Sequence, residues 1–165
     1  MILNILKYPH PILRKKCKAI KRMDGEIRRL INDMIETMLA APGVGLAAPQ
    51  VGQSLRLIAV NIGEGAFAVV NPKIKKKNKH LQIFEEGCLC LPGLVGPVSR
   101  PSQITVEGLD QHGQKFTLEA EGFLATVLQH EIDHLDGIVF IDRVKDKSQI
   151  REVSKKEEEE KKELL

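Results

Sequence analysis

The sequence has no tryptophan, one tyrosine and three cysteines among its 165 residues. It contains no apolar run of about 18 residues or more, so no membrane-spanning helix is expected. Its first residues have no apolar stretch followed by a small-residue cleavage site, which argues against a secretory signal and favours a cytoplasmic protein. The net charge of +3 is too small to indicate a nucleic-acid partner.

The three cysteines, Cys17, Cys88 and Cys90, cannot all pair within one chain. Without a secretory signal we expect a reducing compartment, where clustered cysteines more often bind metal or carry chemistry than form disulfides. Cys17 stands between lysines and is expected to be an incidental thiol. Cys88 and Cys90 are therefore the two cysteines of interest.

The residues that are present indicate one domain over residues 1–165, since 42% of them are hydrophobic and this length supports a single core. Apolar residues recur at helical spacing over 24–38, where Asp24 is a candidate N-cap. The same spacing returns over 122–135, and Gly137 follows as a C-terminal stop signal. Two amphipathic or half-buried helices are therefore expected.

Strands are expected between these helices. Two short buried strands flank a turn at Gly63–Gly65, and two alternating segments form a hairpin that turns at His112–Gly113. The basic segment 73–80 is expected to be a solvated edge or loop. The charged segment 146–165 allows i,i+4 ion pairs but offers few apolar residues, so we expect an exposed, partly frayed C-terminal helix. The order of elements predicts the α+β class.

The most informative segment is QHEIDHLDG, residues 129–137, because it contains an H-E-x-x-H array. On a helix, His130 and His134 share a face and can bind one metal ion. Glu131 lies beside them, where a carboxylate can exchange protons with water held by such an ion. The array supplies two ligands and a base, but it lacks a third ligand.

Cys88, in EEGCLCLPG, is the best candidate for that third ligand. One thiolate and two imidazoles suit Zn(II) or Fe(II), and they leave one tetrahedral position open, as catalytic sites require. Cys90 provides an alternative, because both cysteines could bind the ion and close a structural Cys₂His₂ site. A closed site has no need of Glu131, which favours the open, catalytic interpretation.

Hydrolysis also needs a group that stabilises negative charge on the attacked carbonyl oxygen. The loop GVGLAAPQVG, residues 43–52, offers glycines that let the backbone approach a substrate and the neutral amide of Gln50. A tight turn with an incidental glutamine would have the same sequence, so the loop alone decides nothing.

Together, and in this order, GVGLAAPQVG, EGCLCLPG and QHEIDHLDG closely resemble the motifs of bacterial-type peptide deformylases, and YPHPILRKKCKAI resembles the opening segment of that family. The resemblance implies an α+β fold in which antiparallel strands surround the central metal-binding helix. It also implies hydrolytic removal of the N-formyl group from the formyl-methionine of newly made polypeptides, with release of formate.

The resemblance further implies a role for each matching residue. Cys88, His130 and His134 match the metal ligands, and Glu131 matches the general base and acid. Gln50 and the backbone N–H of Leu89 match the donors that stabilise the oxyanion. The positions that match the substrate-binding surface are Val44, Gly45, Phe84, Gly87, Phe123 and Val127.

For this family the resemblance implies one divalent ion per chain, with Fe(II) as the native metal and Zn(II) or Ni(II) as substitutes. The expected partners are N-formylmethionyl nascent peptides at the ribosome, without direct binding of nucleic acid or membrane. Position 90 departs from the pattern, because the family usually has serine there and this chain has Cys90.

Two other functions are compatible with parts of the sequence. A zincin-type endopeptidase would use the same H-E-x-x-H, but its third ligand lies downstream, where only Asp136, Asp142 and Glu152 are candidates. A metal-stapled binding module would use Cys90 as a fourth ligand and would not be an enzyme.

Overall fold

The computed structural model describes residues 1–154 and 157. The strands form two antiparallel sheets, one of five strands in the order β1-β2-β3-β6-β7 and one of three in the order β4-β5-β8. The helices are α1 (Gly25–Ala40), α2 (Gly122–Leu135) and α3 (Phe140–Arg143). The strands are β1 (Gly45–Ala47), β2 (Leu57–Val60), β3 (Phe67–Lys77), β4 (Leu81–Cys88), β5 (Leu91–Pro101), β6 (Gln103–Leu109), β7 (Lys115–Glu121) and β8 (Arg151–Glu152).

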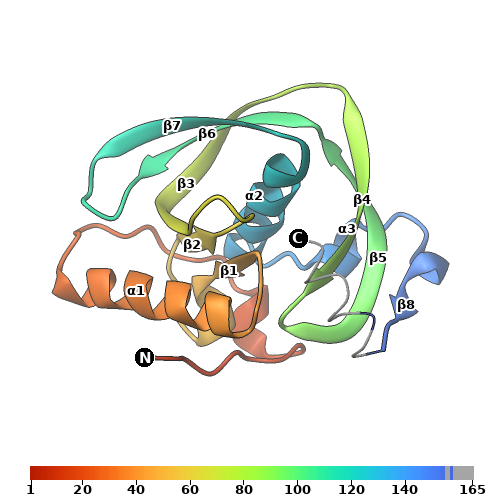
Figure 1. Cartoon of the computed structure of the whole chain (residues 1–165), viewed down its shortest axis with the longest axis horizontal. Coiled ribbons are helices and arrows are strands. Elements are labelled where there is room, and N and C mark those ends of the chain that lie inside the picture. Colours follow the sequence, from red (N-terminus) through yellow and green to blue (C-terminus); the bar gives the residue numbers. More distant parts are fainter. Residues whose placement is uncertain (155–156, 158–165) are drawn as a thin grey trace.

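Helix α2 lies between the two sheets, as Figure 1 shows, and α1 packs on the outside of β1 and β2. The side chains of α2 that face the five-stranded sheet are almost fully buried, among them Ala125, Leu128 and Leu135. Burial on this scale stabilises the fold mainly through the hydrophobic effect. The helix that carries the histidines is thus the centre of the molecule, and this confirms the expected α+β class.

The local sequence signals act as expected at the ends of both long helices. The Asp24 carboxylate accepts a hydrogen bond from the Ile27 N–H at 3.0 Å and caps α1. Gly137, just after α2, has φ +76, a left-handed conformation that glycine adopts without steric cost. A Cβ there would also lie 2.6 Å from the Arg14 carbonyl oxygen.

The two charged segments have different outcomes. The basic segment 73–80 is a strand as far as Lys77, where β3 continues past the end of β2 and pairs only with β6, so its exposed lysines lie on a solvated edge as expected. In the charged segment, Arg151–Glu152 form β8 on the edge of β5, where an exposed helix was expected. Residues 155–156 and 158–165, on which the rest of that expected helix falls, lie outside the described residues. No helix in the described part of the chain has the length and apolarity to cross a membrane.

Candidate metal centre and catalytic cavity

Helix α2 places the two histidines one turn apart on the face turned toward β4. Their ring centroids are 5.2 Å apart and the rings meet edge to face. The His130 ring also stacks on Phe140 of α3, with centroids 6.2 Å apart. Both imidazoles are therefore held by packing on an internal helix, and metal sites on such rigid elements are more precise than those on loops.

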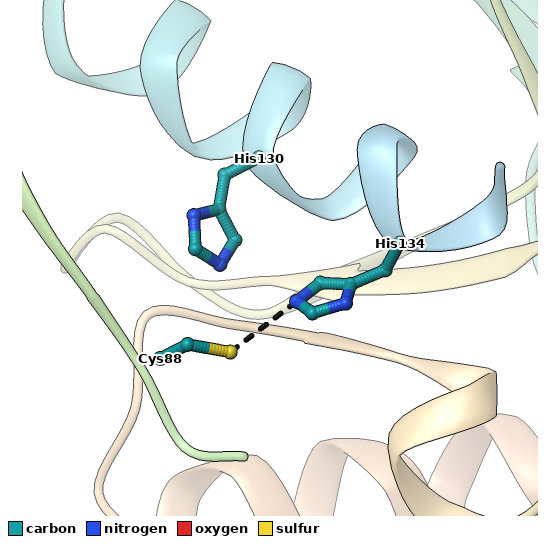
Figure 2. A group of neighbouring side chains, drawn as sticks. All are labelled: Cys88, His130 and His134. Carbon is teal, nitrogen blue, oxygen red and sulfur yellow. Dashed lines mark hydrogen bonds between the residues drawn. The ribbon is translucent and has the colours of Figure 1, made fainter. Parts of the chain in front are cut away.

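Cys88, the last residue of β4, brings a thiol to the same point. Its Sγ lies 3.2 Å from His134 Nε2, and donor atoms of Cys88, His130 and His134 all lie within 4.8 Å of one another. Figure 2 shows the cysteine on its strand facing both histidines of the helix. This group could hold a metal ion, and its sulfur and two nitrogens suit Zn(II) or Fe(II).

The orientation of His130 is determined by an acidic partner. Its Nδ1 lies 2.8 Å from Glu86 Oε1 and can donate its hydrogen to that carboxylate, so Nε2 is the nitrogen left for a metal ion. Burial opposes ionisation of Glu86, but hydrogen bonds from His130 and Arg100 outweigh burial and hold its pKa below the ordinary value. The glutamate therefore stays charged and keeps His130 in the tautomer that a metal requires.

His134 is buried more deeply, with 1% of its surface exposed. Burial lowers its pKa well below the ordinary value, because the charged imidazolium is poorly solvated there. The neutral imidazole that results is the form that binds metals. Its Nδ1 has no hydrogen-bond partner among the described residues, so Nε2, which faces Cys88, is the nitrogen directed at the site.

Glu131 is the neighbouring carboxylate, 2% exposed, with Oε1 3.8 Å from His130 Nε2. Burial raises its pKa to about 7, since few groups around it replace the lost water. A pKa near neutrality suits a residue that must both accept and return a proton. The backbone of Gly45, at the start of β1, passes so close to this side chain that a Cβ would lie 2.7 Å from its Oε2.

Gln50 approaches the cysteine from the other side. Its Oε1 accepts a hydrogen bond from the Ala47 N–H at 2.8 Å, and this bond orients the amide. Its Nε2 donates to Cys88 Sγ at 3.3 Å. The glutamine is 1% exposed, so it is a buried, preoriented donor within reach of the three-donor group.

A cavity of about 400 Å³ opens onto this group and has Cys88, His130 and Glu131 in its wall. Phe84 and Phe123 pack against each other in its wall, with ring centroids 5.7 Å apart and ring planes tilted by 55°. All the positions expected to bind substrate line it, namely Val44, Gly45, Phe84, Gly87, Phe123 and Val127, and so does Leu89. Its size and mixed apolar and polar wall are typical of small-ligand sites.

Cys90 lies behind the site. Its Sγ is 3.1 Å from Cys88 Sγ, but it is fully buried and is not among the three residues whose donor atoms converge. The candidate ligands of an endopeptidase are also elsewhere, because Asp136 pairs with Arg56 at 3.0 Å and Asp142 pairs with Arg14. Among the described residues, the converging donor group therefore includes Cys88 and leaves out Cys90, Asp136 and Asp142.

Known proteins share both this sequence and this fold. The sequence profile of the polypeptide deformylase family matches residues 2–150. A peptide deformylase of Symbiobacterium thermophilum is 47% identical over 161 residues, which cover 96% of this chain and 74% of that protein. One from Dehalococcoides mccartyi (strain CBDB1) is 44% identical over 159 residues, or 95% of each chain.

The chain belongs to the peptide deformylase family. The crystal structure of the peptide deformylase from Thermotoga maritima matches it with a TM-score of 0.87 at 39% identity, covering 88% of this chain and 99% of that one. The resemblance given by the three motifs is therefore confirmed. The chain is an enzyme of protein biosynthesis that removes the N-formyl group from new polypeptides.

The peptide deformylase site also contains residues that sequence reasoning missed. Arg100 of β5 donates to Glu86 from Nε at 2.7 Å and from Nη2 at 3.0 Å, and its Nη1 reaches Asp133 of α2 at 2.9 Å. Glu86 was visible as an acidic residue two positions before Cys88. Its partners stand 14 and 44 positions away, so no local pattern joins them.

Proposed function

We propose that Cys88, His130 and His134 hold the divalent ion of this deformylase and that Glu131 transfers the proton during hydrolysis. The observation that carries this proposal is the convergence of one sulfur and two nitrogen donors in the cavity wall beside a buried carboxyl. When bound, the ion would supply a Lewis acid next to the formyl group.

The side chains then have distinct tasks. Glu131, with its pKa raised to about 7 by burial, accepts a proton from the attacking water and passes it to the departing amine. The Gln50 amide and the Leu89 N–H donate to the formyl oxygen as it becomes negative, and loss of one such donor typically costs about 10²–10³ in rate. Cleavage of the C–N bond leaves formate and a free amino group.

The apolar part of the cavity accounts for the choice of substrate. We assign Phe84, Phe123 and Val127 to the methionine side chain, since these residues form an apolar wall next to the three-donor group. Gly45 and Gly87 both line the cavity, and we assign their backbone to the contacts with an extended peptide. A formyl carbon carries only hydrogen, so it fits where a bulkier acyl group is excluded.

The remaining assignments follow from the family. We propose Fe(II) as the native ion, with Zn(II) or Ni(II) as substitutes, because the same donor set binds all three. We propose that the substrates are N-formylmethionyl nascent peptides met at the ribosome, in the cytoplasm. Residues 1–165 act as one domain in this proposal, and the charged segment 146–165 is an extension of it.

The test of the proton-transfer role is turnover of a formyl-Met tripeptide by protein loaded anaerobically with Fe(II) or Ni(II). Glu131→Ala should keep the metal and lose about 10²–10⁴-fold in turnover, because the carboxyl moves a proton and binds no ion. Metal content by atomic emission is the control. Activity within a few-fold of the parent protein, at equal metal content, would rule out this role.

The ligand set is tested separately by metal affinity. Cys88→Ser should weaken zinc binding strongly, because a thiolate is replaced by a hydroxyl that rarely ionises. Cys90→Ser should leave zinc content nearly unchanged, since only Cys88 belongs to the converging group. Equal zinc loss in both variants would instead indicate the closed four-ligand site.

A further inference from the structure

Cys90 is not a member of the three-donor group, yet it lies directly beside Cys88, which is. Its Sγ lies 3.1 Å from Cys88 Sγ and its side chain is fully buried, packed in the core with Leu13 and Phe140. A disulfide bond is about 2.05 Å long, so the two sulfurs need to close by only about 1 Å. Leu89 and Cys90 form the turn between β4 and β5, which presents both sulfurs on one side.

The two cysteines differ in what can reach them. Cys88 lines the cavity and is open to a small solute, whereas Cys90 is 0% exposed and lies behind it. Cys17, the third cysteine, belongs to the separate core between α2 and the five-stranded sheet. An oxidant entering the cavity therefore meets the Cys88 sulfur first, and Cys90 is the thiol placed to react next.

We propose that Cys88 and Cys90 form a modification site for peroxides, in which oxidation converts the metal ligand Cys88 into half of a reversible disulfide. The Cys88 thiolate attacks one peroxide oxygen; the O–O bond breaks, an S–O bond forms, and hydroxide or an alkoxide leaves and takes a proton from the surrounding water. Sulfur is oxidised by two electrons and the peroxide is reduced.

In the second step Cys90 loses its proton and attacks the sulfenic sulfur of Cys88. The S–S bond forms, the S–O bond breaks, and hydroxide leaves with that proton as water. Cys88 can no longer act as a thiolate ligand, so the ion keeps only two histidine ligands and is released. A disulfide spanning one intervening residue is strained, and strained disulfides are readily reduced by small thiols.

This device also protects the ligand. Without a second thiol, a sulfenic acid continues to sulfinic and sulfonic acids, which thiols do not reverse. With Cys90 at 3.1 Å the sulfenic sulfur is captured before that happens. Oxidation therefore causes a reversible loss of the metal ion, and irreversible oxidation of Cys88 is avoided.

The test uses the whole zinc-loaded protein, because zinc has no redox chemistry and any oxidation is then of sulfur. After a small excess of hydrogen peroxide, free thiols are alkylated and the peptide containing both cysteines is weighed. We expect that peptide to be two hydrogens lighter and unalkylated, with zinc released in parallel to a chromogenic chelator. Dithiothreitol should restore both thiols and zinc binding.

Cys90→Ser and Cys17→Ser are the matched variants. The first should instead accumulate oxygen adducts on Cys88 and lose recovery with dithiothreitol, whereas the second should behave like the parent protein. Oxygen adducts on Cys88 of the parent, formed without a disulfide, would overturn the proposal. Since the inference depends on the ligand role of Cys88, zinc content before oxidation is measured first; failure to bind zinc would contradict that role, while the peptide mass would still report on the thiol pair.

Discussion

Gly45 affects the site because it has no Cβ atom. A Cβ at this position would lie 2.7 Å from Oε2 and 2.8 Å from Cγ and Cδ of Glu131. A Cβ essentially never lies that close to an atom to which it is not bonded, so the glutamate would have to move. The conformation of the carboxyl to which we assign proton transfer therefore depends on a glycine that is 86 positions away in the chain.

Gly45→Ala should lower turnover by about 100-fold while metal content stays the same. The reason is that the new methyl group displaces the Glu131 carboxyl, and a misplacement of about 1 Å can cost a factor of that size. The measurement is the kinetics of a formyl-Met tripeptide with the metal-loaded variant.

Weaker binding of the peptide substrate to the Gly45 backbone would lower the rate too, so a double variant is needed. If the methyl group acts through Glu131, adding Gly45→Ala to Glu131→Ala should cost little more than Glu131→Ala alone. Gly25→Ala is the matched control, since a Cβ there meets nothing closer than 3.5 Å. Independent, additive losses would show that Gly45 acts on the substrate instead.

Arg100 links its own strand to a second strand and to helix α2, which carries both histidines. It connects Glu86 of β4 to Asp133 of α2 from its own place on β5, and Arg143 of α3 completes the group with a bond to Asp133 at 3.0 Å. Arg100 and Glu86 are each about 5% exposed. Charges so deeply buried are tolerated only when paired, so each member depends on the others.

Arg100→Met should destabilise the protein by about 3–5 kcal/mol, because it leaves two carboxylates without their buried partner. The free energy of unfolding from urea titration, measured on metal-free protein, is the readout. Lys75→Met is the control, since its pair with Glu107 spans 3.6 Å with both side chains nearly half exposed. Equally small losses of stability in both variants would mean that the buried Arg100–Glu86 pair contributes no more to the free energy of unfolding than the exposed Lys75–Glu107 pair.

The elements differ in how far the sequence determines them. Helix α2 and the β6–β7 hairpin were predictable, because periodic apolar spacing and a His112–Gly113 turn are local signals. The division of the strands into two sheets was not, and neither was β8, which forms only because Arg151–Glu152 meet the edge of β5. Such pairings join residues that lie far apart in the chain, and no short window of sequence contains both partners.

The residues of the site also differ in how far the sequence predicts them. The motifs singled out Cys88, His130 and Glu131, because each lies in a distinctive short segment, and the structure brings all three into one cavity wall. The residues that orient these side chains belong to no recognisable motif, and their role follows only from where the fold places them. Arg100 and Asp133 have no motif of their own, and the closeness of Gly45 to Glu131 appears only in three dimensions.

Across the whole molecule, Arg14 connects the N-terminal segment to the end of the domain. It donates to both oxygens of Asp142 and to the Gly137 carbonyl, just after α2. Partial burial opposes ionisation of Asp142, but the Arg14 hydrogen bonds outweigh it and lower the pKa of that carboxyl. A lowered carboxyl pKa stabilises the fold above the ordinary value of 3.8, and the effect is lost as pH falls through the folded pKa.

Asp142→Asn should therefore reduce stability at neutral pH and have no such effect in acid. We expect a loss of at most about 1 kcal/mol, since the pair is partly exposed and screened by solvent. Unfolding free energies of the two proteins, measured between about pH 3 and 7, should converge as the pH falls. Glu64→Gln on an exposed turn is the control, and a difference that persists unchanged into acid would show that the ion pair is not the cause.

His130 is oriented by its hydrogen bond with Glu86, and Arg100 holds Glu86 in place. The position of this proposed ligand is therefore set by contacts within the protein. With the ligand set proposed above, one ion could leave and another could enter without displacing this histidine. The element that a molecule carries would then be decided by exchange with its surroundings, and a purified sample would report the ions available to the cell and the buffer.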